Sequence, residues 1–227
     1  MCGIAGIASW IERDDSLTVK KMTNLFAHRG PDDFGIKQLK GACLGHRRLS
    51  IIDLTKDGHQ PMPDNSKRFW IAFNGEIYGF SSLRKELESI GISFNSNSDT
   101  EVLLKTLTHF GLDGLDYCEG MWSFALFDSD EESLTLCRDR FGEKPLYIYR
   151  DNKGIFFASE IKFILALTGN KLEINTDHCY RFLVNGFKSV YKTDSTFYKG
   201  VYELQPSSAL KIFSNGREET NSYWKPK

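Results

Sequence analysis

The sequence has 227 residues, the length of one large domain, and its 41% hydrophobic and 26% charged residues exclude wholesale disorder. Its 29 basic and 30 acidic side chains nearly balance, which argues against a nucleic-acid-binding protein. No apolar stretch approaches the roughly 20 residues of a membrane span, and the apolar segment 3–8 is not preceded by the basic region of a secretory signal. Five cysteines without a Cys-x-x-Cys pair indicate neither a disulfide framework nor a zinc site. We therefore expect a soluble, cytoplasmic, globular protein.

The first two helices are predicted by apolar residues that recur every three to four positions. One begins near Ser16; the other begins at Ser81 or Ser82 and ends at Gly91. Their apolar faces consist of Val19, Met22, Leu25 and Phe26 in the first, and of Leu83, Leu87 and Ile90 in the second.

The third helix has the clearest signals. Ser98 with Glu101 three residues later forms a capping box, and Gly111 provides the stop. The apolar stripe between them is made by Leu103, Leu104, Leu107 and Phe110. Two further helices are predicted over 159–167 and 176–184.

Short alternating runs of aromatic and aliphatic residues predict strands. These runs cover 69–73, 123–127, 134–137, 146–149 and 155–157. Turn-rich spacers between several of them, and Asn215-Gly216 between two later candidate strands, favour antiparallel hairpins. Strand groups interrupted by helices predict a single α+β domain over 1–227, with helices that cover antiparallel sheets.

Cys2 is the candidate nucleophile. Removal of Met1, which is usual before a small residue, would leave Cys2 with both a thiol and a free α-amine. Their reference pKa values are ~8.5 and ~7.7–8.0, so the amine can serve as the base for its own thiol near neutral pH. A Met-Cys start alone is more often incidental, and a buried structural cysteine is the alternative.

A series of motifs in the rest of the chain favours the interpretation of Cys2 as a nucleophile over that of a structural cysteine. In order they are MCGIAGI (1–7), HRGPDD (28–33), HRRLSIIDL (46–54), FNGEIYGF (73–80), SDTEVLL (98–104), GMWSFALFD (120–128), RDRFGEKPLY (138–147) and FASEIK (157–162). Together they closely resemble the N-terminal glutaminase domain of glutamine-hydrolysing asparagine synthetases, which are class II glutamine amidotransferases among the N-terminal-nucleophile hydrolases. The resemblance extends to about Trp224 and implies a four-layer αββα sandwich.

The resemblance also implies L-glutamine as the substrate and assigns its binding residues. Glutamine is a zwitterion, so its site needs one cation and one or two anions. The assigned residues are Arg48 for the α-carboxylate, Glu76 and Asp99 for the α-ammonium, Ile51 and Ile52 in the strand after Arg48 for backbone contacts, and Asn74 and Gly75 for the oxyanion hole.

Each of these residues has a simpler interpretation when taken alone. Arg48 beside Arg47 resembles a solvated basic pair, and Asn74-Gly75 resembles a hairpin turn. Glu76 could be a surface carboxylate, and Asp99 could only favour its helix dipole. Their joint occurrence with Cys2 favours the catalytic interpretation.

For the remaining motifs we predict structural rather than catalytic roles. Gly41-Ala42-Cys43-Leu44-Gly45 matches the G-x-C-x-G elbow of another glutaminase class, but no histidine is followed two positions later by Glu, so Cys43 is expected to be buried. Cys118, Cys137 and Cys179 lack ligand spacing. Arg29 is assigned no direct role beside the Gly30-Pro31 turn, and RDRFGEKPLY is interpreted as a strand end and loop.

The resemblance implies glutamine hydrolysis through a Cys2 thioester, without metal or cofactor. In the family, ammonia passes to an ATP- and Mg-dependent synthetase domain, which these residues do not contain. The ending at 223–227 carries no cap or turn signal, so we expect a truncated chain or a partner chain that accepts ammonia. Two alternatives stay open: a non-catalytic structural or sensing module, and an amidotransferase whose acceptor is a sugar carboxylate or another acid rather than aspartate. No nucleic acid or membrane partner is expected.

Overall fold

The computed structural model describes residues 1–9, 14–168, 172–186 and 193–226. Two six-stranded sheets form its centre, with the strand orders β10-β8-β9-β1-β3-β2 and β12-β11-β7-β6-β5-β4. The first sheet consists of β1 (Gly3–Ala8), β2 (Asp33–Leu39), β3 (Ala42–Arg48), β8 (Tyr147–Asp151), β9 (Gly154–Ala158) and β10 (Val201–Glu203). The second consists of β4 (Met62–Pro63), β5 (Phe69–Tyr78), β6 (Glu119–Asp128), β7 (Ser133–Arg138), β11 (Ser208–Phe213) and β12 (Glu218–Ser222).

Strand neighbours pair antiparallel, as the short turn-rich spacers predict. The β11–β12 hairpin turns at Asn215-Gly216, where Gly216 has a φ of 82°, a left-handed conformation that glycine adopts without a steric penalty. The strand β2 was not predicted, although Phe34, Ile36 and Leu39 lie in it.

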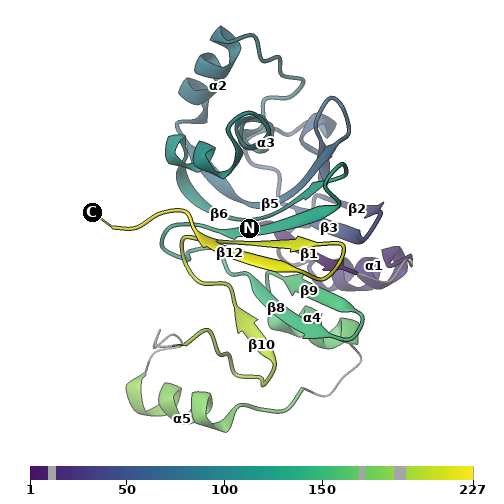
Figure 1. The fold of residues 1–227 in the computed structure, drawn as a ribbon, viewed down its shortest axis with the longest axis vertical. Helices are drawn as coiled ribbons and strands as arrows, with labels where there is room; N and C mark the ends of the chain where they lie inside the picture. The colour runs from purple at the N-terminus through teal and green to yellow at the C-terminus, as the bar shows by residue number, and fades with distance from the viewer. Residues whose placement is uncertain (10–13, 169–171, 187–192, 227) are drawn as a thin grey trace.

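Helices cover the outer face of each sheet, so that the fold has four layers. Figure 1 shows, from top to bottom, the helices α2 and α3, the two sheets, and α4 below them. The helices are α1 (Ser16–Leu25), α2 (Phe80–Ser89), α3 (Asp99–Phe110), α4 (Ile161–Thr168) and α5 (Thr176–Asn185), with the 3-10 turns η1 (Lys56–Gly58) and η2 (Gly111–Tyr117). This αββα architecture is the one expected from the sequence.

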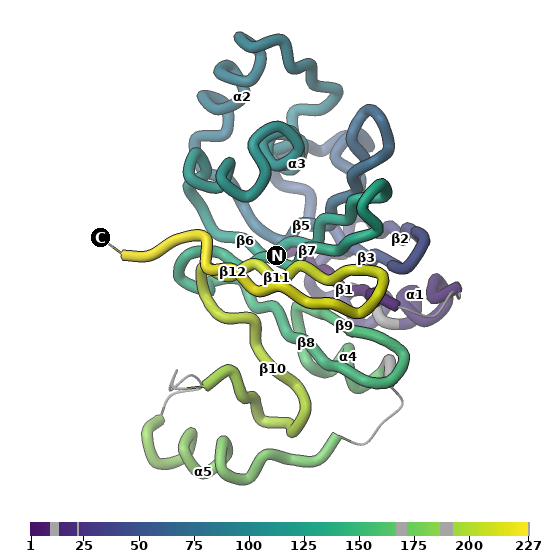
Figure 2. The backbone as a smooth tube through the Cα atoms, viewed as in Figure 1, coloured from purple at the N-terminus to yellow at the C-terminus, as the bar shows by residue number. Residues whose placement is uncertain are grey.

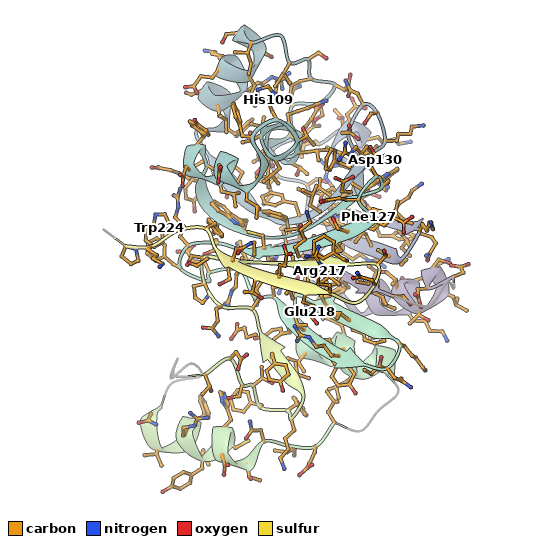
Figure 3. The ribbon with its side chains drawn as sticks, in the orientation of Figure 1. His109, Phe127, Asp130, Arg217, Glu218 and Trp224 are labelled. Carbon is orange, nitrogen blue, oxygen red and sulfur yellow. The ribbon has the colours of Figure 1, made fainter. Side chains whose placement is uncertain are left out.

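Alternation along the strands divides the core into layers. In β1, Ile4 and Ala8 pack between the sheets, whereas Ala5 and Ile7 pack against the helical side. Phe127 of β6 belongs to the inter-sheet layer (Figure 3). Because β1 is buried on both faces, its sequence is a continuous apolar run without polar alternation.

The start of one helix and the capping of another differ from the predictions. Helix α2 begins at Phe80, after Gly79 in a left-handed conformation (φ 62°), and not at Ser81 or Ser82. At α3, Ser98 Oγ accepts the Glu101 amide at 3.2 Å, which is half of the predicted capping box. The Glu101 carboxylate instead accepts the amides of the preceding loop, because that loop folds back over the helix start.

The apolar face of α1 is narrower than predicted. Val19 and Phe26 are fully buried, but Leu25 is 48% exposed. The side chain of Met22 lies outside the described part of the structure. Helix α3 ends before Gly111 as predicted.

Candidate active site

A cavity of about 280 Å³ lies where β1 and β3 of one sheet meet β5 of the other. The N-terminus is drawn at the level of the sheets, whereas the C-terminus projects away from them (Figure 2). All the predicted site residues line this cavity: Cys2, Arg48, Ile51, Ile52, Asn74, Gly75, Glu76 and Asp99. Strand ends and one helix start therefore bring together residues that are far apart in the sequence.

Cys2 directly precedes β1, and its side chain contacts the backbone of Leu49. The Leu49 amide donates to Sγ at 3.4 Å, and Sγ lies 3.7 Å from the Leu49 carbonyl oxygen. Burial raises the pKa of the Cys2 thiol, and the hydrogen bond from Leu49 opposes this effect only in part. A buried thiol of this kind needs a base close to it to become a nucleophile.

The backbone of Cys2 is held by Arg29, which the sequence analysis assigned no direct role. Arg29 Nε donates to the Cys2 carbonyl at 2.8 Å, and its Nη1 pairs with Glu160 at 3.0 Å. Burial alone would raise the pKa of Glu160, but hydrogen bonds from Lys162, His28 and Arg29 outweigh it and hold the pKa at about 2. Arg29 therefore connects the main chain of Cys2 to the Glu160 carboxylate.

Arg48 ends β3 and is only 7% exposed, so it is not a solvated basic residue. Its guanidinium donates to the carbonyls of Thr55, at 2.7 Å, and Asp53. Gly58 packs directly on the guanidinium: a Cβ added at this position would lie 2.0 Å from Arg48 Nη2, so the contact leaves no room for a side chain. By contrast, the neighbouring Arg47 points away and donates to the Thr23 carbonyl.

The loop around Arg48 corrects the prediction for Ile51 and Ile52. They lie in a bend after β3 rather than in a strand, because the chain folds back to bring the Asp53 and Thr55 carbonyls onto Arg48. Ile51 is 72% exposed and Ile52 37% exposed, so both form the rim of the cavity.

Asn74, Gly75 and Glu76 lie within β5 and not in a hairpin turn. Asn74 is on the same strand face as Ala72, which packs between the sheets, and it is 1% exposed. Its Nδ2 donates to Ser123 Oγ on β6 at 3.4 Å. At Gly75, a Cβ would lie 2.3 Å from the Met121 carbonyl oxygen, so this position needs glycine.

Asp99 is the first residue of α3, and its Oδ2 accepts the Ile77 amide at 3.1 Å. Burial, and to a smaller extent the nearby Glu76 carboxylate, raise the pKa of Asp99 to about 6 against the opposing backbone hydrogen bonds. Two carboxylates, Glu76 and Asp99, thus line a cavity that the Arg48 guanidinium also lines.

Sequence reasoning missed several residues that line the cavity. Gln60 connects three elements: its Oε1 accepts the Phe73 amide at 2.7 Å, and its Nε2 donates to Thr100 Oγ1 at 3.1 Å. Lys144, in the segment interpreted as a loop, also lines the cavity. Gln60 precedes a proline and Lys144 lies in a loop, so neither belongs to a sequence pattern that predicts a place in the cavity.

The other cysteines do not line this cavity. Cys43 lies in β3, is fully buried and packs with Ile7 and Val19, and burial raises its pKa to about 12. The elbow interpretation is therefore wrong, because an elbow nucleophile must be exposed at the end of a strand. Burial also raises the pKa of Cys118 and of Cys137.

The described residues contain neither a candidate metal site nor a helix that could span a membrane. Within ranges 1–9, 14–168, 172–186 and 193–226, no group of three or more His, Cys, Asp or Glu side chains has the arrangement of a metal site. In the same ranges no helix combines the length and apolar character required for crossing a bilayer.

Comparisons with known proteins agree with this geometry. An asparagine synthetase [glutamine-hydrolyzing] of Bacillus subtilis is 35% identical over 229 residues, covering 99% of this chain and 35% of that protein. The amidase chyE of Penicillium rubens is 34% identical over 236 residues, covering 99% of this chain and 34% of that protein. The chain thus spans about a third of the length of these relatives.

A solved structure has the same fold at lower identity. The glutamine phosphoribosylpyrophosphate amidotransferase of B. subtilis matches with a TM-score of 0.73 at 19% identity, covering 99% of this chain and 50% of that chain. The family described as the glutamine amidotransferase domain matches residues 1–224. With nearly its whole length matched, this chain belongs to the glutamine amidotransferase domain family.

Proposed function

We propose that this domain hydrolyses L-glutamine to glutamate and ammonia at Cys2. The observation that carries this proposal is the cavity itself, which is lined by one thiol, one buried guanidinium and two carboxylates. This set complements the charges of an α-amino acid: Arg48 would bind the α-carboxylate, and Glu76 and Asp99 the α-ammonium. The side-chain amide would then be directed at Cys2, with backbone contacts at Ile51 and Ile52.

Removal of Met1 supplies the base. The α-amine of Cys2 takes the proton from the thiol, and the sulfur forms a bond to the amide carbon of glutamine. The developing oxyanion accepts hydrogen bonds from Asn74 Nδ2 and from the Gly75 amide. The carbon–nitrogen bond then breaks, and the Cys2 ammonium returns its proton to the departing ammonia. Water, deprotonated by the same amine, hydrolyses the γ-glutamyl thioester and restores the thiol.

This half-reaction balances with water alone, so we assign it no metal and no organic cofactor. We further propose that the ammonia is used by an asparagine synthetase-type unit, which would need ATP and Mg²⁺ to activate the acceptor carboxylate. We place that unit outside residues 1–227, as a further domain or a partner chain. The protein would act in the cytoplasm, where the free thiols found in the structure stay reduced.

The acceptor is the less constrained part of the proposal. Relatives of similar identity are named as asparagine synthetases and as amidases. Aspartate is therefore our first candidate acceptor, and another acid is the second. A non-catalytic module is disfavoured because the cavity retains the nucleophile and the full charge set.

A glutaminase assay tests the proposal. Protein whose Met1 has been removed, as verified by mass, should release glutamate and ammonia from glutamine in equal amounts. Cys2→Ala should reduce the release to background, and Cys43→Ala should leave it unchanged. Equal turnover by the Cys2→Ala variant and the wild type would contradict the proposal.

A further inference from the structure

Lys144 is a buried cation beside the N-terminus that the proposed reaction does not use. It is 6% exposed, lines the cavity, and its Nζ lies 3.4 Å from Sδ of Met1. The Lys144 ammonium therefore contacts the side chain of the residue whose removal frees the α-amine of Cys2. No ion pair of Lys144 is found among the described residues, so its charge is not neutralised by direct contact with a carboxylate.

The loop that carries Lys144 is rigidly held. Asp139 accepts the Lys144 amide at 2.9 Å, and Arg138 Nε donates to the Lys144 carbonyl at 2.9 Å. Asp139 also accepts the amides of Phe141 and Glu143, at 3.0 and 2.9 Å. The buried Arg138–Asp139 pair of residues thus fixes the direction in which Lys144 leaves the backbone.

Arg29, another cation near Cys2, differs from Lys144 in its contacts. Arg29 is paired with Glu160 and donates to the Cys2 carbonyl, so its charge is partly compensated. Burial, followed by the charge of Arg29, lowers the pKa of Lys144. Lys144 lies in the cavity, and no carboxylate of the described residues pairs with it, so its charge is available to act on groups nearby.

We propose that Lys144 is a positioning residue for the charge state of Cys2: its ammonium repels a proton from the Cys2 α-amine and keeps that amine neutral, ready to accept the thiol proton. This inference rests on the proposed glutaminase function. The charged groups that face the amine and Lys144 from the surrounding elements are Arg29, Arg48, Asp53, Glu76, Asp99, Asp139 and Glu143. Glu76 and Asp99 act in the opposite sense to Lys144, and the α-ammonium of bound glutamine would offset them.

The test compares Lys144→Met, which keeps the length and removes the charge, with Lys144→Arg, which keeps a permanent charge. Lys153→Met, on the exposed β8–β9 turn, is the matched control. The rate of glutamine hydrolysis at saturating glutamine, kcat, is measured against pH on protein without Met1, so that the effect of Asp99 on glutamine binding does not enter the profile. Because the amine must be neutral to act, its protonation defines the acid limb of the profile.

In Lys144→Met the acid limb should move to higher pH by about one unit, and the activity should recover above it. Lys144→Arg and Lys153→Met should keep the wild-type limb. An unchanged limb in Lys144→Met would overturn the inference. A loss in Lys144→Arg as large as in Lys144→Met would also overturn it, because the lysine would then act as a proton acceptor and not as a fixed charge.

A second measurement separates this inference from the proposed function. The α-amine of Cys2 can be titrated directly by its pH-dependent reaction with acetic anhydride, quantified on the N-terminal peptide by mass spectrometry. A higher pKa of the Cys2 amine in Lys144→Met supports the inference even if no variant hydrolyses glutamine. The lack of hydrolysis would then count against the proposed function alone. An equal amine pKa in wild type and Lys144→Met overturns the inference whatever the activity. Thermal unfolding of each variant verifies that the fold is retained.

Discussion

The Leu49 amide donates to Cys2 Sγ at 3.4 Å and so holds the thiol at the end of β3. This contact is one reason why the thiol faces the cavity, since Leu49 directly follows Arg48. The same backbone segment therefore positions both the proposed nucleophile and the proposed carboxylate-binding cation.

We expect a glutamine analogue carrying a diazo-ketone in place of the side-chain amide to label Cys2 alone. The charge set of the cavity would direct the reactive carbon to Cys2, whereas Cys43, Cys118 and Cys137 are fully buried with raised pKa values. Cys179, on α5, is partly exposed but does not line the cavity. Peptide mass mapping after stoichiometric labelling identifies the site. Excess glutamine should protect Cys2, and an adduct on Cys43 would contradict the site assignment.

Much of the fold could be predicted because its signals are local. Most of the predicted strands are apolar runs, the β11–β12 turn carries glycine, and α3 has a cap, a stripe and a stop, so each of these elements is determined largely within its own segment. The errors lie where a distant group decides the backbone. Ile51 and Ile52 leave the sheet because Arg48 takes the carbonyls of Asp53 and Thr55, a requirement that no periodicity shows.

The site was predicted by resemblance and not by pattern. Asn74-Gly75 has the local appearance of a turn, and only its pairing with Ser123 and Trp122 on β6 makes it part of a strand. Gln60 and Lys144 were missed for the same reason: their positions depend on long-range contacts with Phe73 and Met1. Such contacts become visible only once the two sheets are packed together.

Asn74→Ala should lower kcat by ~10²–10³ with a smaller change in KM, because the Asn74 amide would donate most strongly to the oxyanion of the transition state. Asn74→Asp has the same shape but offers only acceptors, so it should be at least as damaging. Steady-state kinetics of glutamate formation provide the measurement. Ser123→Ala removes only the partner of Nδ2 and should cost less. Similar kcat values for Asn74→Ala and the wild type would exclude Asn74 from the oxyanion hole.

Gly58→Ala should raise the KM for glutamine by about 10-fold or more while kcat changes less. The new Cβ would lie 2.0 Å from Arg48 Nη2 and must displace the guanidinium that is proposed to bind the α-carboxylate. Arg48→Ala should show the same split between KM and kcat, with a larger effect. Asp57→Ala, at the exposed neighbouring position, is the control and should behave as the wild type. A kcat effect without a KM effect in both Gly58→Ala and Arg48→Ala would remove Arg48 from the carboxylate site.

Asp99→Asn should weaken glutamine binding but stabilise the fold, and the stabilisation should depend on pH. Burial raises the pKa of Asp99 from 3.8 to about 6 in the folded protein, so folding favours the protonated carboxyl. The wild type is therefore penalised as pH rises from about 4 through 6, because the unfolded chain ionises first. A difference of about two pH units corresponds to about 3 kcal/mol above pH 7, and Asn avoids this penalty since it stays neutral.

Urea denaturation of both proteins at pH 5.0 and 7.5 measures this effect. The advantage of Asp99→Asn should be largest at pH 7.5 and shrink at pH 5.0, where the wild-type carboxyl is mostly protonated in the folded state. Glutamine binding should depend on pH as well, because only the ionised carboxylate attracts the α-ammonium. The wild-type KM should rise as pH falls below about 6, while the KM of Asp99→Asn stays high throughout. Asp116→Asn, on the exposed surface of η2, should change neither property. If Asp99→Asn proved no more stable than the wild type at pH 7.5, the prediction that the ionised Asp99 carboxylate lowers the stability of the fold would be wrong.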